Sequence, residues 1–253
     1  MMNRLAMQSA AFAAVLLIWE AGVYVGDISP AVLPPVAEVA TAAVELWGRD
    51  TFWSSIYLTV RDAAVGLVIA SALGIPAGLV IGSTPWLERS TRLMVDFGRS
   101  FPQIALLPIL LMVLGTSSAM KIVLIAFACF FPILLQTIYG TRQLDSTLRD
   151  TVRAYRIPVH LKYLKVILPA ASPMIMTGLR ISVVVSILVA IAIEITSPVK
   201  GMGDELSKAR DFYETNVAIA YALYAGLLGV IVNAVADRSE KYFLSWHFRS
   251  QEA

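Results

Sequence analysis

Among the ionisable residues inside otherwise apolar segments, Arg61, Arg180 and Glu194 are the first candidates for chemistry. Charges inside membrane-crossing segments are rare and usually functional. Arg61 could guide an anion by its positive potential, or it could form a structural ion pair with Glu194 or with Asp62. Glu194 follows Pro173 by about 31 Å of helix, near the outer interface, where it would line a vestibule or pair structurally. Arg180 lies about 10 Å beyond the same proline, and we expect it to anchor in the inner headgroups.

No catalytic constellation accompanies these charges. The sequence contains no G-x-x-x-x-G-K-[ST] phosphate loop and no plausible Ser/His/Asp arrangement. His160 and His247 are expected to be interface or surface residues rather than catalytic bases. Cys129 is the only cysteine, which excludes an intrachain disulfide, and no Cys/His cluster has the spacing of a metal site. Any chemistry must therefore come from a partner.

The residues of segment 150–173 have a different chemistry, because the segment is basic and interrupted by prolines. Residues 150–157 can form a helical turn or two, Pro158 interrupts them, and residues 159–167 read as a second short helix. Leu168-Pro169 then leads directly into an apolar segment. A compact knob that continues into a membrane helix can transmit force, so we interpret this stretch as a coupling element.

The composition sets these residues in a membrane protein. Hydrophobic residues make up 58% of the 253 residues and charged residues only 15%, against about 25% charged in soluble domains. A formal charge of +2 is compatible with nucleic-acid binding. However, the basic residues are scattered between apolar segments rather than gathered with aromatic residues, which argues against nucleic-acid binding. We expect one membrane domain.

Six apolar windows are long enough, or nearly so, to cross about 30 Å of hydrocarbon as helices. They are residues 5–26, 55–82, 101–115, 121–140, 172–197 and 217–236. The first could instead be a cleaved signal peptide, but its length, Trp19 and Glu20 argue against this. The third is short and would borrow a turn or two from residues 92–98. It contains Pro102, Gln103 and Pro108, so it either lines a cavity or is a kinked packing helix.

The flanking charges predict the orientation. With the N-terminus inside, the inner segments hold 13 of the 20 Lys and Arg residues and the outer segments hold 5, Lys121 among them. Lys and Arg favour the cytoplasmic side, so both termini and segment 150–173 are predicted to be cytoplasmic. Outer connections 27–53 and 201–216 each contain a short amphipathic pattern, typical of a solvated connector or of a lid or receptor contact.

Segment 150–169 resembles the cytoplasmic EAA loop of ABC importer permeases. Leu168-Pro169 aligns with the Leu-Pro of that loop, Val166 with its Ile, Arg156 with its Gly, and Asp150-Thr151-Val152 with Glu-Ala-Ala. The stretches ILPAASPMIMTGLRIS, ASALGIPAGLVIG and VLPPVAEV resemble the nitrate, sulfonate, taurine and bicarbonate branch. Glycine permits a tight turn with positive φ, so we expect the turn at Arg156 to be built differently.

The resemblance implies an all-α polytopic fold of the type I importer permease kind, with six transmembrane helices in a bacterial inner membrane. It implies residues 1–54 as a first helix with an outer connecting helix, 55–240 as the core permease with its coupling loop at 141–169, and 241–253 as a tail. It implies two copies of the chain, two ATPase subunits that carry ATP and Mg, and an outer solute-binding protein, with no cofactor in this chain. The implied ATPase-docking residues are Asp150, Arg153, Ala154, Arg156, Ile157, Pro158, His160 and Leu161. The candidate residues of the translocation pathway are Arg61, Gln103, Pro108, Ser186 and Glu194.

The transported solute would be a small organic or inorganic anion such as a sulfonate, nitrate or carboxylate, and a neutral heterocycle stays open. An ion-coupled secondary transporter is the alternative, and it would place ionisable groups near the membrane midplane. A membrane-embedded enzyme would need His, Asp or Glu residues converging at one depth. The central parts of the predicted spans are nearly free of charge, which favours the ATP-driven importer.

Overall fold

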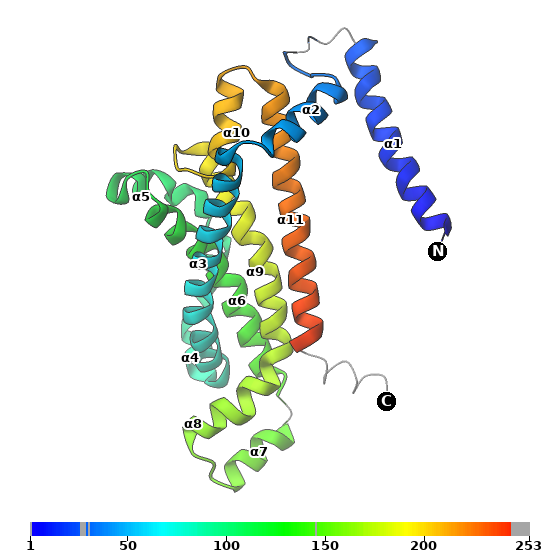
Figure 1. The fold of residues 1–253 in the computed structure, drawn as a ribbon. Coiled ribbons are helices and arrows are strands. Elements are labelled where there is room, and N and C mark those ends of the chain that lie inside the picture. Colours follow the sequence, from blue (N-terminus) through cyan, green and yellow to red (C-terminus); the bar gives the residue numbers. More distant parts are fainter. Residues whose placement is uncertain (1, 26–28, 30, 145, 244–253) are drawn as a thin grey trace.

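The computed structural model describes residues 2–25, 29, 31–144 and 146–243 of the chain. Within these ranges the chain is helical (Figure 1). The elements are α1 (Met2–Tyr24), α2 (Val36–Leu46), α3 (Asp50–Ser83), α4 (Pro85–Ser100), the 3-10 helix η1 (Gln103–Leu106), α5 (Leu107–Leu114), α6 (Ser118–Arg142), α7 (Ser146–Ala154), α8 (Val159–Leu161), the π-helix η2 (Lys162–Ile167), α9 (Leu168–Thr196), α10 (Met202–Asp211) and α11 (Thr215–Phe243). His247 and most of the predicted tail 241–253 lie outside the described residues.

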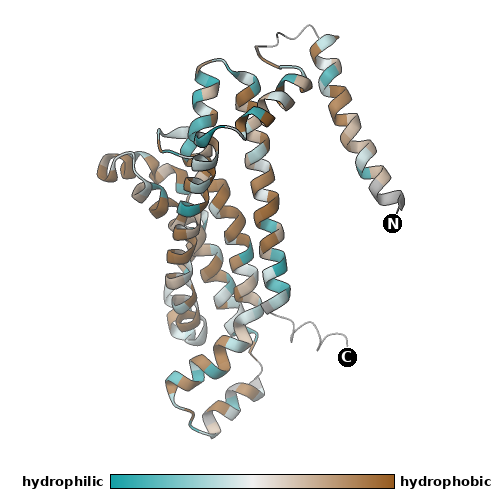
Figure 2. Cartoon of the chain, viewed as in Figure 1, coloured by the Kyte–Doolittle hydropathy of each residue, from teal (hydrophilic) through white to brown (hydrophobic). Residues whose placement is uncertain are grey.

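The predicted spans are confirmed as helices, with one correction. Five helical segments are long and apolar enough to cross a membrane, or six if the bent pair formed by α4 and η1–α5 counts as one span. This pair bends by 85°, so the third span is not one straight helix from residue 101. Phe101 precedes Pro102 and takes an extended conformation with ψ 128°, as the residue before a proline tends to do. In Figure 2 the hydrophobic colour dominates along the long helices, and hydrophilic residues are more frequent toward their ends.

A stripe of small residues brings α3 against α6. Gly66, Ala70, Gly74, Gly78 and Gly82 recur every four residues and therefore share one face of α3. A Cβ at Gly78 would lie 2.5 Å from Cβ of Thr137, and the other three glycines are also closely approached by α6. Small residues let membrane helices approach this closely, and packing rather than hydrophobic burial holds them together.

Helices α6 and α9 complete the centre of the bundle. Gly140 of α6 packs against Ala171 and Met174 of α9, and Gly178 of α9 packs against Gln136. Buried apolar side chains from α3, α6 and α9 form the main core: Ala63, Ala70, Met120, Leu124, Ile125, Cys129, Ile133, Ile187, Ala190 and Ile193.

Helix α1 stands beside this bundle and is tied to the start of α2 (Figure 1). The Trp19 indole donates to the Pro34 carbonyl at 3.0 Å, and the Val36 amide donates to the Glu20 carboxylate at 3.1 Å. The two residues that argued against a signal peptide thus connect α1 to the rest of the chain. Both outer amphipathic patterns are confirmed as helices, α2 and α10.

Candidate functional site: a coupling loop and a buried ion cluster

The segment that the sequence analysis interprets as a coupling element protrudes from one end of the bundle as a knob, residues 146–167, made of α7, a tight turn, α8 and η2 (Figure 1). The turn ends α7 with two backbone bonds, from the Tyr155 amide to the Thr151 carbonyl at 3.0 Å and from the Ile157 amide to the Val152 carbonyl at 3.3 Å. The second of these is the 6→1 bond of a Schellman motif, in which the residue before the donor is left-handed. Arg156 takes that place with φ 45°.

The expectation that Arg156 builds this turn differently is therefore wrong. Arg156 adopts the positive φ that a glycine would supply, and a non-glycine residue costs roughly 1–2 kcal/mol there. The pattern of the turn is kept because its hydrogen bonds satisfy the end of α7. Arg156 itself is exposed on the knob.

The knob continues into α9 without a break, as predicted, although the connecting segment is a π-helix rather than an α-helix. Pro169 has no amide to donate, and its ring would clash with the Lys165 carbonyl in an α-helix. The π-helix Lys162–Ile167 lies just before this proline, and the Leu168 amide donates to the Tyr163 carbonyl, five residues back. Val159–Thr196 thus forms one apolar helical segment that leads from the knob into the membrane.

The described docking candidates form the outer surface of the knob. Asp150, Ala154, Pro158 and His160 are exposed like Arg156, and Ile157 and Leu161 are partly buried. Arg153 is also a docking candidate, but its side chain is not among those that the structure describes. Tyr155 and Val159, which the sequence analysis did not select, are 80% and 69% exposed. Exposed large apolar side chains on a small protrusion are typical of an interaction surface, and their position on both sides of Pro158 was the signal available in the sequence.

The second feature is an ion cluster of Asp62, Lys121 and Glu194 inside the bundle. The Lys121 ammonium lies 2.8 Å from the Asp62 carboxylate and 2.7 Å from the Glu194 carboxylate, and all three side chains are fully buried. The sequence analysis counted Lys121 among the outer flanking charges, and this burial corrects that assignment. Buried charges are stable only when they are paired.

Arg61 does not contact Glu194, and the predicted pair between them is wrong. Its guanidinium donates instead to the Asp62 carboxylate at 2.7 Å and to the Ser118 hydroxyl at 3.0 Å. The other structural pair foreseen for Arg61, with Asp62, is thus the observed one. Arg61 thus contacts the cluster through Asp62, and its own side chain remains 40% exposed.

The cluster also fixes the loop before α10. Glu194 accepts from the Thr59 hydroxyl at 2.9 Å and from the Gly203 amide at 3.0 Å, and Lys121 donates to the Lys200 carbonyl at 3.2 Å. A Cβ at Gly203 would lie 2.5 Å from the Ile191 carbonyl oxygen, so this loop needs glycine. The cluster therefore links α3, α6 and α9 to the loop that carries α10.

This convergence was missed by the sequence analysis, which counted Lys121 among the outer flanking charges. Asp62, Lys121 and Glu194 come from three segments far apart in the sequence, and the available signal was Lys121 next to an apolar run together with the Gly-Met-Gly after Glu194. Among the described residues, no three His, Cys, Asp or Glu side chains could hold a metal ion. On α10, outside the spans, Lys208 donates hydrogen bonds to the carboxylates of Asp204 and then Glu205, and these bonds raise the pKa of Lys208 to about 12.

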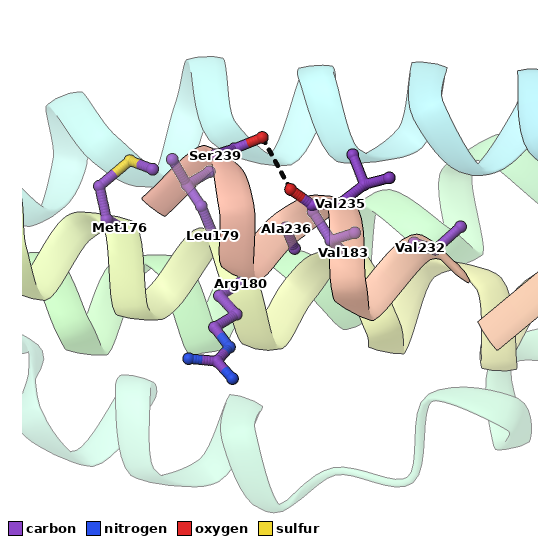
Figure 3. Close-up of a pocket in the computed structure, with 8 residues that line it drawn as sticks. All are labelled: Met176, Leu179, Arg180, Val183, Val232, Val235, Ala236 and Ser239. Carbon is purple, nitrogen blue, oxygen red and sulfur yellow. Dashed lines mark hydrogen bonds between the residues drawn. The ribbon is translucent and has the colours of Figure 1, made fainter. Parts of the chain in front are cut away.

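Arg180 lies between α9 and α11 rather than alone at a membrane surface. Its guanidinium pairs with Asp237 at 3.2 Å and Glu240 at 3.1 Å and is 41% exposed. It borders an apolar cavity of about 240 Å³. Figure 3 shows the lining residues from α9 facing those from α11, with the Ser239 hydroxyl donating to the Val235 carbonyl at 2.8 Å. Anchoring of Arg180 in the headgroups stays a prediction.

The remaining pathway candidates do not form one site. Ser186 is buried in the bundle and donates to the Val183 carbonyl at 2.7 Å. Pro108 is exposed on α5, and Gln103 is partly buried at the bend before it. Gln103 borders an apolar cavity of about 220 Å³. The other wall of this cavity is lined by Leu124, Val189, Ala192 and Ile193.

Comparisons with known proteins agree on one family. The model of the family "Binding-protein-dependent transport system inner membrane component" matches residues 74–245. A protein of Escherichia coli named for aliphatic sulfonates transport, SsuC, is 30% identical over 233 residues, which cover 92% of this chain and 89% of that protein. The bicarbonate transport system permease protein CmpB of Synechococcus elongatus is 31% identical over 204 residues, 80% and 71% of the two chains.

The taurine transport system permease protein TauC of Escherichia coli is 25% identical over 240 residues, 93% of this chain and 87% of that protein. Among solved structures, a chain of the MetNI methionine ABC transporter in an inward-facing conformation superposes with a TM-score of 0.67. It shares 17% sequence identity, and the match covers 76% of this chain and 95% of that one. This likeness concerns the fold alone.

Proposed function

The chain belongs to the family of binding-protein-dependent transport system inner membrane components, and from this premise we propose that it forms half of a pathway for a small anion. The family assigns the chain as a multi-pass inner-membrane permease subunit of an ABC importer, which is not itself catalytic. The proposal adds the solute class, because relatives are named for sulfonates, taurine and bicarbonate.

We further propose the assembly in which this subunit works. Two copies would enclose the pathway, two ATPase subunits would bind the two knobs, and a solute-binding protein would deliver the anion outside. ATP would close the ATPase pair and bring the knobs together. A ligand shifts a conformational equilibrium only through its different affinity for the two states, and ATP binding supplies that difference.

The single observation that supports this mechanism best is the continuity of the knob with α9. Asp150, Ala154, Arg156, Pro158 and His160 are exposed, and the chain behind them runs into a membrane helix through η2 without a loop. A displacement of the knob would therefore move α9 directly. The division of the chain at residues 54 and 240, and the cytoplasmic position of both termini, remain part of the proposal.

Uptake in proteoliposomes tests the proposed function. The permease would be reconstituted with its co-purified ATPase and binding protein, and uptake of ³⁵S-labelled ethanesulfonate and ¹⁴C-bicarbonate would be measured with ionophores that collapse all ion gradients. We expect uptake of an anion that needs ATP and is unchanged by the ionophores. Uptake that stops with the gradients while ATP remains would support the ion-coupled alternative, and a thermal-shift screen of the binding protein would identify the solute.

A further inference from the structure

Helix α4 turns back along α6 and thereby enters the membrane region. Glu88 near its start pairs with Arg142 at the end of α6, at 2.9 Å. Further along α4, Val95 packs with Leu134 and Ile138 in one buried cluster. Near the end of α4, Gly98 lies against the Phe131 ring. Residues 142 and 131 are about 16 Å apart along a helix. With the inner edge of the hydrocarbon taken at Arg142, the end of α4 reaches roughly half the 30 Å hydrocarbon thickness.

Helical spacing divides α4 into three faces. The packed face contains Thr91, Val95 and Gly98. A second face is apolar and exposed, with Trp86, Leu93 and Phe97. The third face, the charged strip, contains Glu88, Arg89, Arg92, Asp96 and Arg99.

The charged strip cannot face lipid over its whole length. A charged residue at the centre of a lipid-facing helix costs about 2.5–3.5 kcal/mol or more, and such residues normally face a water-filled cavity. The structure provides this space as two clefts of about 390 and 290 Å³, both lined by Glu88, Arg92 and Arg142. The strip is therefore the wall of a hydrated space between α4 and the end of α6. The two clefts share three lining residues, and we refer to them together as the cleft.

The cleft carries a positive excess. Arg89, Arg92, Arg99 and Arg142 line it together with only two carboxylates, Glu88 and Asp96. Asp96 lies 3.0 Å from Arg99 and 3.9 Å from Arg92, so one carboxylate is shared by two arginines. A cleft with an excess of positive charge in its lining concentrates anions.

We propose that this cleft is an anion-binding site in the inner half of the pathway, which receives the transported anion on its way to the cytoplasm. The proposal rests on the proposed function, because it names residues that would act on the same solute. Guanidinium groups present paired donors to sulfonate, carboxylate or phosphate oxygens. The carboxylates compete for the same donors, which keeps binding weak enough for release. A lipid phosphate has the same chemistry, so the experiment must distinguish it from a solute.

Cysteine labelling tests the cleft without requiring transport. Cys129, the only native cysteine, is fully buried and gives a silent background. In the reconstituted complex, Asp96→Cys should react with water-soluble methanethiosulfonates, and the sulfonate-bearing reagent should outpace the trimethylammonium reagent about tenfold, relative to their rates on free cysteine. The neighbouring Phe97→Cys, on the exposed apolar face, should be unreactive with both. Equal labelling of the two positions, or no preference for the anionic reagent, would overturn the proposal.

Transport assays then distinguish a transported anion from a lipid headgroup as the occupant of the cleft. The Arg92→Gln/Arg99→Gln double variant should slow ³⁵S-ethanesulfonate uptake about tenfold or more, whereas Arg92→Lys/Arg99→Lys keeps the charge and should retain most of it. The same loss is expected in vesicles of phosphatidylcholine alone and in vesicles with added phosphatidylglycerol. A loss confined to the anionic vesicles would assign the site to a lipid headgroup and overturn the proposal. If the wild type imports no anion, the proposed function fails; if it imports and the glutamine variant matches it, only this inference fails.

Discussion

Replacement of Lys121 by methionine should strongly destabilise the membrane domain. The substitution leaves the buried Asp62 and Glu194 carboxylates without the ammonium that lies within 2.8 Å of both. Removal of one partner of a buried ion pair typically costs 3–5 kcal/mol. Glu194 would keep its bonds from Thr59 and Gly203, and Asp62 would keep Arg61. We therefore expect the low end, about 3 kcal/mol.

The assay is reversible unfolding of the detergent-solubilised chain followed by circular dichroism. The expected loss corresponds to a roughly 100-fold shift of the unfolding equilibrium. Lys208→Met is the matched control, because its lysine is half exposed in ion pairs on α10, and such pairs contribute only about 0.2–1 kcal/mol. Addition of Glu194→Gln to Lys121→Met should recover part of the loss, since one unpaired buried charge is then removed. If Lys121→Met unfolds like the control and the double variant gains nothing, the reasoning about the cluster is refuted.

Three further predictions concern packing, the turn and the α9–α11 contact. Gly78→Leu should separate α3 from α6 and lower the free energy of unfolding by about 1–3 kcal/mol or more, measured as above, and an unchanged midpoint would contradict the close packing on Thr137. Arg156→Gly should relieve the positive φ and stabilise the turn by about 1 kcal/mol, visible as slower amide exchange at Ile157, whereas faster exchange would contradict the Schellman geometry. Arg180→Gln should change the free energy of unfolding by less than about 1 kcal/mol because its ion pairs are partly exposed; a loss of several kcal/mol would show that the contact is stronger than its exposure implies.

The sequence predicted the elements that depend on local pattern. Apolar runs gave the spans, the amphipathic patterns gave α2 and α10, and the Leu-Pro at 168–169 gave the knob that continues into α9. These predictions succeeded because length, periodicity and proline chemistry act within one segment. The fold of the family could be inferred from the same motifs.

The features that escaped prediction depend on contacts between segments. Lys121 flanks an apolar run and was counted as a surface charge, and only the packing of α6 against α3 and α9 buries it beside Asp62 and Glu194. The sequence analysis extended the third span by a turn or two into residues 92–98, the second half of α4, but the packing of this helix along α6 is visible only in the fold. The positive φ of Arg156 shows that hydrogen bonds at the end of a helix can outweigh the conformational preference of one residue.

The proposed mechanism requires contact between the knob and an ATPase, and site-specific cross-linking measures this contact directly. Ala154→Cys is exposed on the knob, Trp53→Cys is exposed near the start of α3 at the opposite end of the bundle, and the native Cys129 is buried. A benzophenone maleimide attached to either cysteine would be photolysed in membranes that contain the complete complex. We expect a covalent product with the ATPase subunit from Ala154→Cys and none from Trp53→Cys. An ATPase product from Trp53→Cys alone, or none from Ala154→Cys in a complex that still co-purifies with its ATPase, would contradict it.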